Sequence, residues 1–150
     1  MIHRKALTTS SSRETEEVAE SLAREIEAGQ VVLLEGDLAA GKTTFVRGLV
    51  RGLGGDPDEV SSPTFVIVQS YPCRRVQWLH HVDCYRLEDD PGELRNVGME
   101  EVLDDTAAII AVEWPKTSVS QLMTAFGPNP ITVTLRSTGE TTREIEITAP

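Results

Sequence analysis

Apolar residues recur with helical spacing in two segments of the N-terminal third and form a continuous run between them. An apolar residue returns every four positions within residues 11–28, which predicts a helix with one face toward a core. The four apolar residues 31–34 predict a short strand that is buried on both faces. A second amphipathic segment predicts a helix over residues 42–53.

The remainder of the chain contains several predicted strands and shorter helical segments. Strands are expected at residues 65–71, 76–82, 107–112, 131–136 and 143–148. Helices are expected at residues 91–103 and 115–126. The last two strands alternate apolar and polar residues around a polar turn, which predicts an antiparallel hairpin. We therefore expect an α/β sandwich with a mostly parallel central sheet, antiparallel hairpins and helices on both faces.

Length and composition are those of a single globular domain. The 150 residues fit one domain with one core, and 39% hydrophobic and 25% charged residues are ordinary values. No apolar run approaches the ~20 residues that span a bilayer, and residues 1–12 contain no apolar signal segment. Cys73 and Cys84 are too few for a disulfide framework, which favours two reduced thiols. We expect a cytoplasmic protein with no membrane contact.

Acidic residues outnumber basic residues by 24 to 14, and the formal net charge is -10. Strong nucleic-acid binding depends on Lys and Arg at phosphates, so this balance argues against charge-driven binding by the chain alone. Residues 86–105, called the acidic segment below, contain eight acidic and two basic residues. This segment is either a solvated helical face or a docking surface for a basic partner.

The strongest chemical signal is Gly-Asp-Leu-Ala-Ala-Gly-Lys-Thr at residues 36–43, a match to the phosphate-binding loop G-x-x-x-x-G-K-[ST]. It follows a predicted strand and opens a predicted helix, the context of a P-loop NTPase-like fold. Backbone N–H groups and the helix N-terminus would surround phosphate oxygens, and Lys42 would add a positive charge near the β- and γ-phosphates. The residues expected here to bind the nucleotide are Asp37, Leu38, Ala39, Ala40, Gly41, Lys42, Thr43 and Thr44.

Two carboxylates, Asp83 and Glu113, follow apolar predicted strands. Open α/β sheets bind ligands beyond the carboxyl ends of their strands, so either acid is able to reach the phosphates. Mg²⁺ takes only one or two carboxylates, which leaves one acid for the metal and one for the attacking water. We expect Thr43 and Asp83 to share Mg²⁺, and Glu113 and Lys42 to be catalytic. For each acid taken alone, the alternative is an ordinary solvent-facing side chain.

Thr64, His81 and Trp114 are weaker candidates near the same site. Thr64 lies in a polar cluster that resembles a switch loop beside the γ-phosphate, although a strand cap explains it equally well. His81 precedes Asp83 by two positions on the same strand face, which suggests a hydrogen-bonding support role. Trp114 either stacks on the nucleotide base or on a partner, or belongs to the core.

The expected nucleotide is ATP rather than GTP. The sequence contains no N-K-x-D or T-K-x-D motif for reading guanine. A D-x-x-G match at residues 89–92 follows no apolar strand, and we treat it as accidental. The expected cofactors are therefore ATP and Mg²⁺.

Together these motifs resemble one family, TsaE, the P-loop ATPases of bacterial tRNA threonylcarbamoyladenosine biosynthesis. The family's phosphate loop is matched at residues 36–44, except that Ala39 replaces a glycine. A residue with a Cβ avoids positive φ, so this departure bears on the local loop conformation. The other family motifs are matched in order by residues 61–65, by His81, Asp83, Tyr85, Arg86 and Leu87, by Gly98, Glu100, Glu101 and Leu103, and by Glu113 and Trp114.

The resemblance implies an ATP-hydrolysing subunit that acts with the proteins TsaB and TsaD. Transfer of the threonylcarbamoyl group to the adenosine beside the anticodon belongs to TsaD, so this chain would meet tRNA only indirectly, through the complex. Two other classes stay open. One is a small-molecule kinase, although residues 116–150 lack the Arg-rich lid that such enzymes usually carry. The other is a nucleotide-dependent switch module that does not hydrolyse its ligand.

Overall fold

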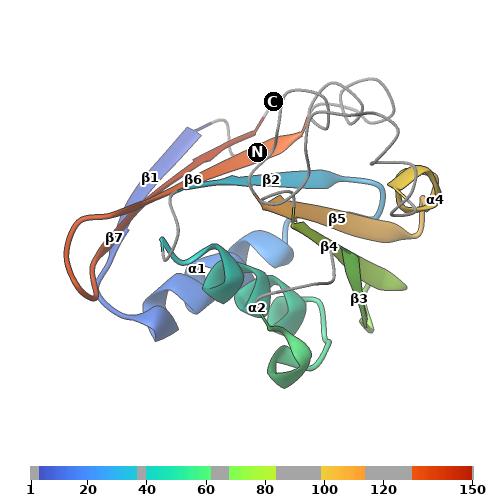
Figure 1. Ribbon diagram of the computed structural model, residues 1–150, viewed down its shortest axis with the longest axis horizontal. Helices are drawn as coiled ribbons and strands as arrows, with labels where there is room; N and C mark the ends of the chain where they lie inside the picture. The colour runs from blue at the N-terminus through green and yellow to red at the C-terminus, as the bar shows by residue number, and fades with distance from the viewer. Residues whose placement is uncertain (1–3, 37–39, 62–67, 84–98, 114–129, 150) are drawn as a thin grey trace.

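The computed structural model describes residues 4–36, 40–61, 68–83, 99–113 and 130–149, which form a seven-stranded sheet with helices packed against it (Figure 1). The strands are β1 (Arg4–Thr9), β2 (Val31–Glu35), β3 (Val68–Pro72), β4 (Trp78–Asp83), β5 (Ala108–Glu113), β6 (Ile131–Ser137) and β7 (Arg143–Thr148). The helices are α1 (Ser12–Ala23), α2 (Lys42–Gly52), the short 3-10 helix η1 (Pro57–Glu59) and α4 (Met99–Leu103). The predicted helix at 115–126, most of the one at 91–103 and the start of the strand at 65–71 lie outside the described residues.

The sheet has a parallel centre and antiparallel edges. Its strand order is β1-β7-β6-β2-β5-β4-β3, and β6, β2, β5 and β4 are parallel to one another. The β6–β7 hairpin is antiparallel, as its sequence pattern predicts, and so are the β3–β4 and β1–β7 pairs. The expected α/β fold is confirmed. Since the central strands are parallel, their carboxyl ends lie together at one end of the sheet.

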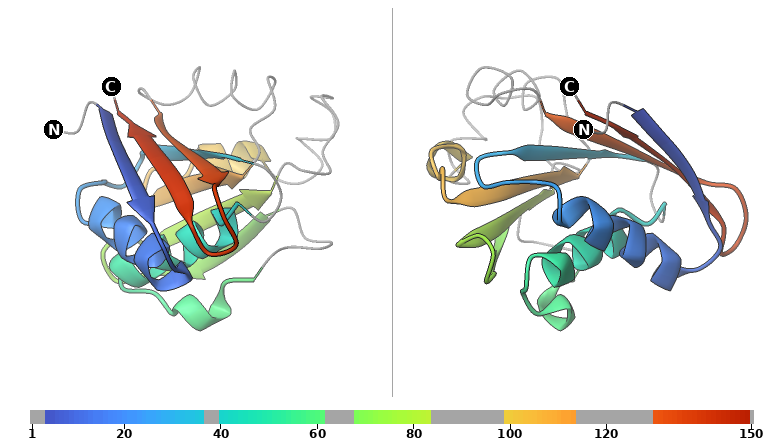
Figure 2. Two further views of the ribbon diagram at one scale, coloured as in Figure 1. Left: turned by 90° about the vertical axis from the view of Figure 1, so that its left-hand side faces the viewer. Right: turned by 180° about the vertical axis from the view of Figure 1, so that it is seen from behind.

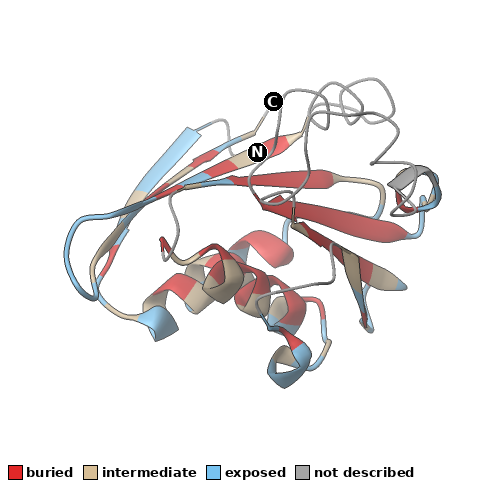
Figure 3. Cartoon of the chain, in the orientation of Figure 1, coloured by how far each residue is buried: buried red, intermediate tan, exposed pale blue. Residues whose placement is uncertain are grey.

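Helices α1 and α2 lie side by side against one face of the sheet (Figures 1 and 2). Buried residues concentrate between these helices and the central strands, where Phe45 and Leu49 pack in one cluster with Leu34 (Figure 3). A Cβ at Gly48 would lie 2.3 Å from the Glu16 carbonyl oxygen, so a glycine is what lets the two helices approach this closely. None of the described helices is long and apolar enough to cross a membrane.

Two elements differ from the sequence prediction. The first helix ends at Ala23 rather than at residue 28, and Arg75 donates hydrogen bonds to the carbonyl oxygens of Ala23 and Arg24 at 2.8 and 3.3 Å. Carbonyls at a helix end need such partners, and the chain then turns so that Ile26 is buried. Strand β1 has no counterpart in the prediction, because most of its residues are exposed and only its pairing with β7 makes it a strand.

Candidate functional site

The phosphate-binding loop connects β2 to α2 at the carboxyl end of the parallel strands. A Cβ at Gly36 would lie 2.6 Å from the Leu135 carbonyl oxygen of β6, so this position has room for glycine alone. Gly41 has a φ of 101°, in the left-handed region that favours glycine, and it is the residue from which α2 begins. The two motif glycines are therefore required by the geometry of strand, loop and helix. Residues 37–39 lie outside the described residues.

Lys42 begins α2, and its side chain reaches back to the start of the loop. Its Nζ donates a hydrogen bond to the Gly36 carbonyl oxygen, and only 6% of the residue is exposed. The first N–H groups of a helix lack intrahelical partners, and the helix dipole is positive at this end. A buried ammonium group beside these N–H groups gives the loop the field that phosphate oxygens require.

Glu113 ends β5 and lies across from the first turn of α2. Its Oε1 accepts a hydrogen bond from Thr43 Oγ1 at 3.3 Å, and its Oε2 accepts one from His81 Nε2. The residue is buried, with 4% exposed. Both carboxylate oxygens have hydrogen-bond partners, and these hold the side chain in one orientation. The structure thus brings the loop and the predicted catalytic acid into direct contact.

His81 and Tyr71 extend this contact into the sheet. The His81 side chain is fully buried, and its Nδ1 faces the Tyr71 hydroxyl at 3.5 Å. The hydroxyl also donates to Gln69 on the same strand. Burial raises the pKa of the Tyr71 phenol, a backbone hydrogen bond with Ser61 opposes that rise, and the negative charge of Glu113 adds to it. The phenol is therefore neutral at physiological pH. The contacts from Thr43 through Glu113 and His81 to Tyr71 connect the loop to β3.

Asp83 ends β4 and is the register partner of Glu113 on the neighbouring parallel strand. The residue is half-buried. In the described ranges no group of three or more His, Cys, Asp or Glu side chains converges as a metal site. Mg²⁺ prefers a few hard oxygen ligands together with water and phosphate oxygens, and the Thr43 hydroxyl with the two carboxylates fits that preference.

A small polar pocket lies beside the loop, and sequence reasoning did not identify it. Its volume is about 70 Å³, and it is formed by the start of α1, the start of α2 and the β6–β7 turn. Arg143 donates hydrogen bonds to the carbonyl oxygens of Gly139 and Thr142 at 3.1 and 2.8 Å, which hold its side chain near Gly41. No motif marks this pocket, because it joins three distant segments. Its lining residues are Ser11, Ser12, Thr15, Gly41, Thr44, Glu140, Thr141 and Arg143.

The predicted site residues fall into two groups. Thr64, Trp114 and residues 37–39 lie outside the described residues, so their roles stay predictions. The remaining candidates lie at the loop, at the start of α2 or at the ends of β4 and β5: Ala40, Gly41, Lys42, Thr43, Thr44, Asp83 and Glu113.

Comparison with known proteins gives one consistent family. The model of the family described as "Threonylcarbamoyl adenosine biosynthesis protein TsaE" matches residues 9–145. A Bacillus subtilis protein named tRNA threonylcarbamoyladenosine biosynthesis protein TsaE is 36% identical over 141 residues, 94% of this chain and 83% of that protein. The protein of the same name from Treponema pallidum is 35% identical over 91% of this chain and 95% of its own length. The Rickettsia conorii relative is 37% identical over 71% of this chain, and the match spans only 59% of that longer protein.

The solved structures agree with the sequence matches. The crystal structure of Bacillus subtilis YdiB superposes with a TM-score of 0.70 at 29% identity, and the match covers 99% of this chain and 87% of YdiB. The family model covers nearly the whole chain, including the phosphate loop and both strand-end carboxylates. The chain therefore belongs to the TsaE family of threonylcarbamoyl adenosine biosynthesis proteins.

Proposed function

We propose that the protein binds ATP with Mg²⁺ and hydrolyses the ATP, as the ATPase subunit of tRNA threonylcarbamoyladenosine biosynthesis. The observation that carries this proposal is the hydrogen bond from Thr43 Oγ1 to Glu113 Oε1, which joins the phosphate loop to a strand-end carboxylate. Phosphoryl transfer needs three groups within one small site. These are hydrogen-bond donors to the phosphate oxygens, a metal ligand and a group that positions the nucleophile. Membership of the TsaE family supports the pathway.

Lys42 and the N-terminus of α2 bind the phosphates in this account. The Gly36 carbonyl oxygen compensates the buried ammonium group of Lys42 when no phosphate is present. A γ- or β-phosphate oxygen is a stronger partner for an ammonium group than a carbonyl, so the Lys42 side chain turns to the nucleotide when it enters. The charge of Lys42 then offsets the negative charge that develops during transfer.

Thr43 and Asp83 are the proposed Mg²⁺ ligands, and Glu113 is the proposed group that orients the attacking water. When bound, Mg²⁺ neutralises charge on the β- and γ-phosphate oxygens. Glu113 is suited to its role because the hydrogen bond with His81 fixes one carboxylate oxygen. The other oxygen accepts a hydrogen bond from Thr43 and is able to accept one from the attacking water in its place. His81 acts in this scheme as a positioning residue.

The Thr43–Glu113 contact also favours a second assignment, in which the two carboxylates exchange roles. If the Thr43 hydroxyl binds Mg²⁺ through its oxygen, it still has its hydrogen to donate. Glu113 accepts that hydrogen bond, so its carboxylate would lie beside the metal. Asp83 would then orient the water from the neighbouring strand. Substitution of each acid separates the two assignments. Loss of the metal ligand should weaken ATP binding only when Mg²⁺ is present, whereas loss of the residue that orients the water should lower the hydrolysis rate.

The polar pocket beside Gly41 and Thr44 adjoins the first turn of α2, next to the proposed phosphate position. Its volume of about 70 Å³ has room for a sugar hydroxyl or a water molecule and not for a whole nucleoside. Its hydroxyl groups offer hydrogen-bond partners for a ribose hydroxyl of the proposed ATP. Trp114 is the remaining candidate for base stacking, from outside the described residues.

The proposed partners are TsaB and TsaD, with tRNA reached only indirectly through the complex, in the cytoplasm. A chain with a net charge of -10 has little affinity of its own for a phosphate backbone, which suits that division of labour. Most of the acidic segment, proposed to dock a basic patch of a partner, lies outside the described residues. In its described part, Glu101 and Asp104 are exposed.

The test is release of inorganic phosphate from Mg²⁺-ATP by the protein alone and with the TsaB–TsaD pair. The proposal predicts slow release alone and faster release with the pair. Transfer of the γ-phosphate to a small acceptor, with no release in its absence, would instead identify a small-molecule kinase. A single slow turnover that the pair leaves unchanged would identify a switch module.

A further inference from the structure

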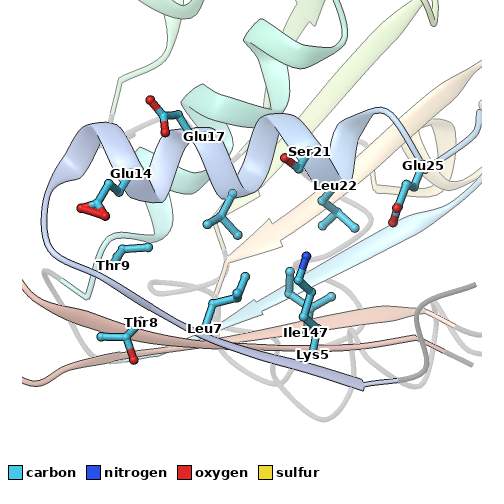
Figure 4. Close-up of a pocket in the computed structure, with 11 residues that line it drawn as sticks. Lys5, Leu7, Thr8, Thr9, Glu14, Glu17, Ser21, Leu22, Glu25 and Ile147 are labelled. Atoms are coloured by element: carbon cyan, nitrogen blue, oxygen red, sulfur yellow. The ribbon is translucent and has the colours of Figure 1, made fainter.

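A groove that shares no residue with the loop or its carboxylates runs between α1 and β1 (Figure 4). Its volume is about 280 Å³, and its lining comes mainly from β1, α1 and the turn after α1. The groove has an apolar base made by Leu7, Val18, Leu22 and Ile147. Leu7 and Val18 are half-buried, so part of this base is open to a ligand.

Strand β1 forms one side of the groove and is an edge of the sheet. It pairs with β7 on one side, and no described strand pairs with its other side. An edge strand presents N–H and C=O groups that pair readily with a further strand. Figure 4 shows Lys5 and Leu7 rising from β1 toward α1. Because side chains alternate along a strand, a segment added beside β1 would place every second side chain under α1.

The opposite edge of the sheet is less suited to strand addition. That edge is β3, a five-residue strand that ends in Pro72. Proline has no N–H group to donate to a neighbouring strand. Strand β1 has six residues and no proline, so every one of its backbone N–H groups is present.

The charges around the groove favour a ligand with basic side chains. Three carboxylates, Glu14, Glu17 and Glu25, line it together with one ammonium group, that of Lys5, and Glu17 also pairs with Arg13 of α1 at 3.3 Å. Hydrogen bonds from Ser10 lower the pKa of Glu14, which therefore stays ionised. Glu14 and Glu17 lie on α1 and Glu25 lies in the turn after it, so the carboxylates are spread along one side of the groove. Alternate side chains of a strand added beside β1 would face this side.

We infer that the groove binds an extended segment of a partner protein that carries Lys or Arg at alternating positions and pairs with β1 as an additional strand. The aliphatic stems of the basic side chains lie on Leu7 and Val18, and their charged ends reach the carboxylates of α1 and its following turn. Backbone pairing supplies affinity, and the row of carboxylates supplies selectivity for basic residues.

The experiment measures binding of a fluorescent Lys-Thr-Lys-Thr-Lys-Thr-Lys peptide to the full chain by anisotropy at low salt. Glu17→Lys combined with Glu25→Lys reverses two of the three carboxylates, and we expect about tenfold weaker binding or more. The matched control is Asp58→Lys with Glu59→Lys, an equal charge change on the exposed η1 helix, which should alter the affinity less than about twofold. Circular dichroism checks that both double variants are folded.

Two further peptides test strand pairing rather than charge attraction alone. N-methylation of alternate amides keeps every charge and removes hydrogen-bond donors, and in one of the two alternating patterns it should weaken binding about tenfold. A Lys-Lys-Lys-Lys-Thr-Thr-Thr peptide has the same composition without the alternation and should bind more weakly. Equal affinity of all these peptides, or equal loss in the η1 control, would overturn the proposal and leave only non-specific attraction to an acidic protein.

Discussion

His81 Nε2 donates a hydrogen bond to Glu113 Oε2 inside the sheet, and the other Glu113 oxygen faces Thr43 of the phosphate loop. The His81 side chain is fully buried and lies on a different strand from Glu113, so the pair ties β4 to β5 where both strands end. A carboxylate fixed at one oxygen keeps its second oxygen in a defined direction. This relationship connects His81 to the proposed site through Glu113.

Replacement of His81 tests this positioning role. His81→Leu removes the donor, and we expect ATP turnover to fall about 10- to 100-fold while the KM for ATP changes little. His81→Gln retains an N–H donor and should recover part of the loss. Steady-state phosphate release measures both. A merely structural role predicts equal effects of the two variants, accompanied by a lower melting temperature.

Glu113→Gln tests the group proposed to orient the attacking water. The change keeps the shape of the side chain and removes its charge, so ATP should still bind while turnover falls about 10²-fold or more. Equilibrium ATP titration and phosphate release on the same preparation separate the two effects. If ATP binding is lost instead, Glu113 is a metal or structural residue.

Asp83→Asn tests the proposed metal ligand. Asp83 lies beside Glu113 in register and supplies a hard oxygen, so its loss should weaken Mg²⁺-ATP binding much more than binding of ATP in EDTA. Calorimetric titrations with and without Mg²⁺ give the comparison. An equal loss in both titrations rejects the assignment.

Gly48→Ala tests the close packing of α1 on α2 that supports the loop. The added Cβ would lie 2.3 Å from the Glu16 carbonyl oxygen and 2.7 Å from the Ala19 Cβ, so the helices must separate. We expect a loss of about 1–3 kcal/mol in the free energy of unfolding, measured in urea. The control is Gly139→Ala, whose nearest neighbour is the hydroxyl of the Thr142 side chain. Equal unfolding midpoints for the two variants would contradict this packing.

Local sequence patterns predict the parts of the site that are close along the chain. The loop from Gly36 to Lys42 could be predicted because strand, glycines and helix are contiguous and each has its own signal. The strand-end positions of Asp83 and Glu113 followed from apolar runs of limited length. Thr64 and Trp114 were weaker local candidates, and both lie outside the described residues.

Contacts between distant segments could not be predicted in the same way. The Tyr71–His81 approach depends on the β3–β4 register, and the polar pocket depends on the fold bringing Arg143 to Gly41. Neither relationship has a local signal, because sheet register is set by the packing of the whole sheet. Strand β1 was missed for the same reason, since its pairing with β7 rather than its own composition makes it a strand.

Titration of the folded protein with ATP, compared with Lys42→Ala, tests the central claim most directly. Lys42 is the only lysine between residues 6 and 115, and its Nζ is held at the phosphate loop. Lys5→Ala on the exposed β1 strand removes an equal charge away from the loop and should bind ATP like the wild type. The account predicts that Lys42→Ala keeps the wild-type circular dichroism spectrum and loses ATP binding. Wild-type affinity of that variant would show that the nucleotide phosphates do not bind at this loop.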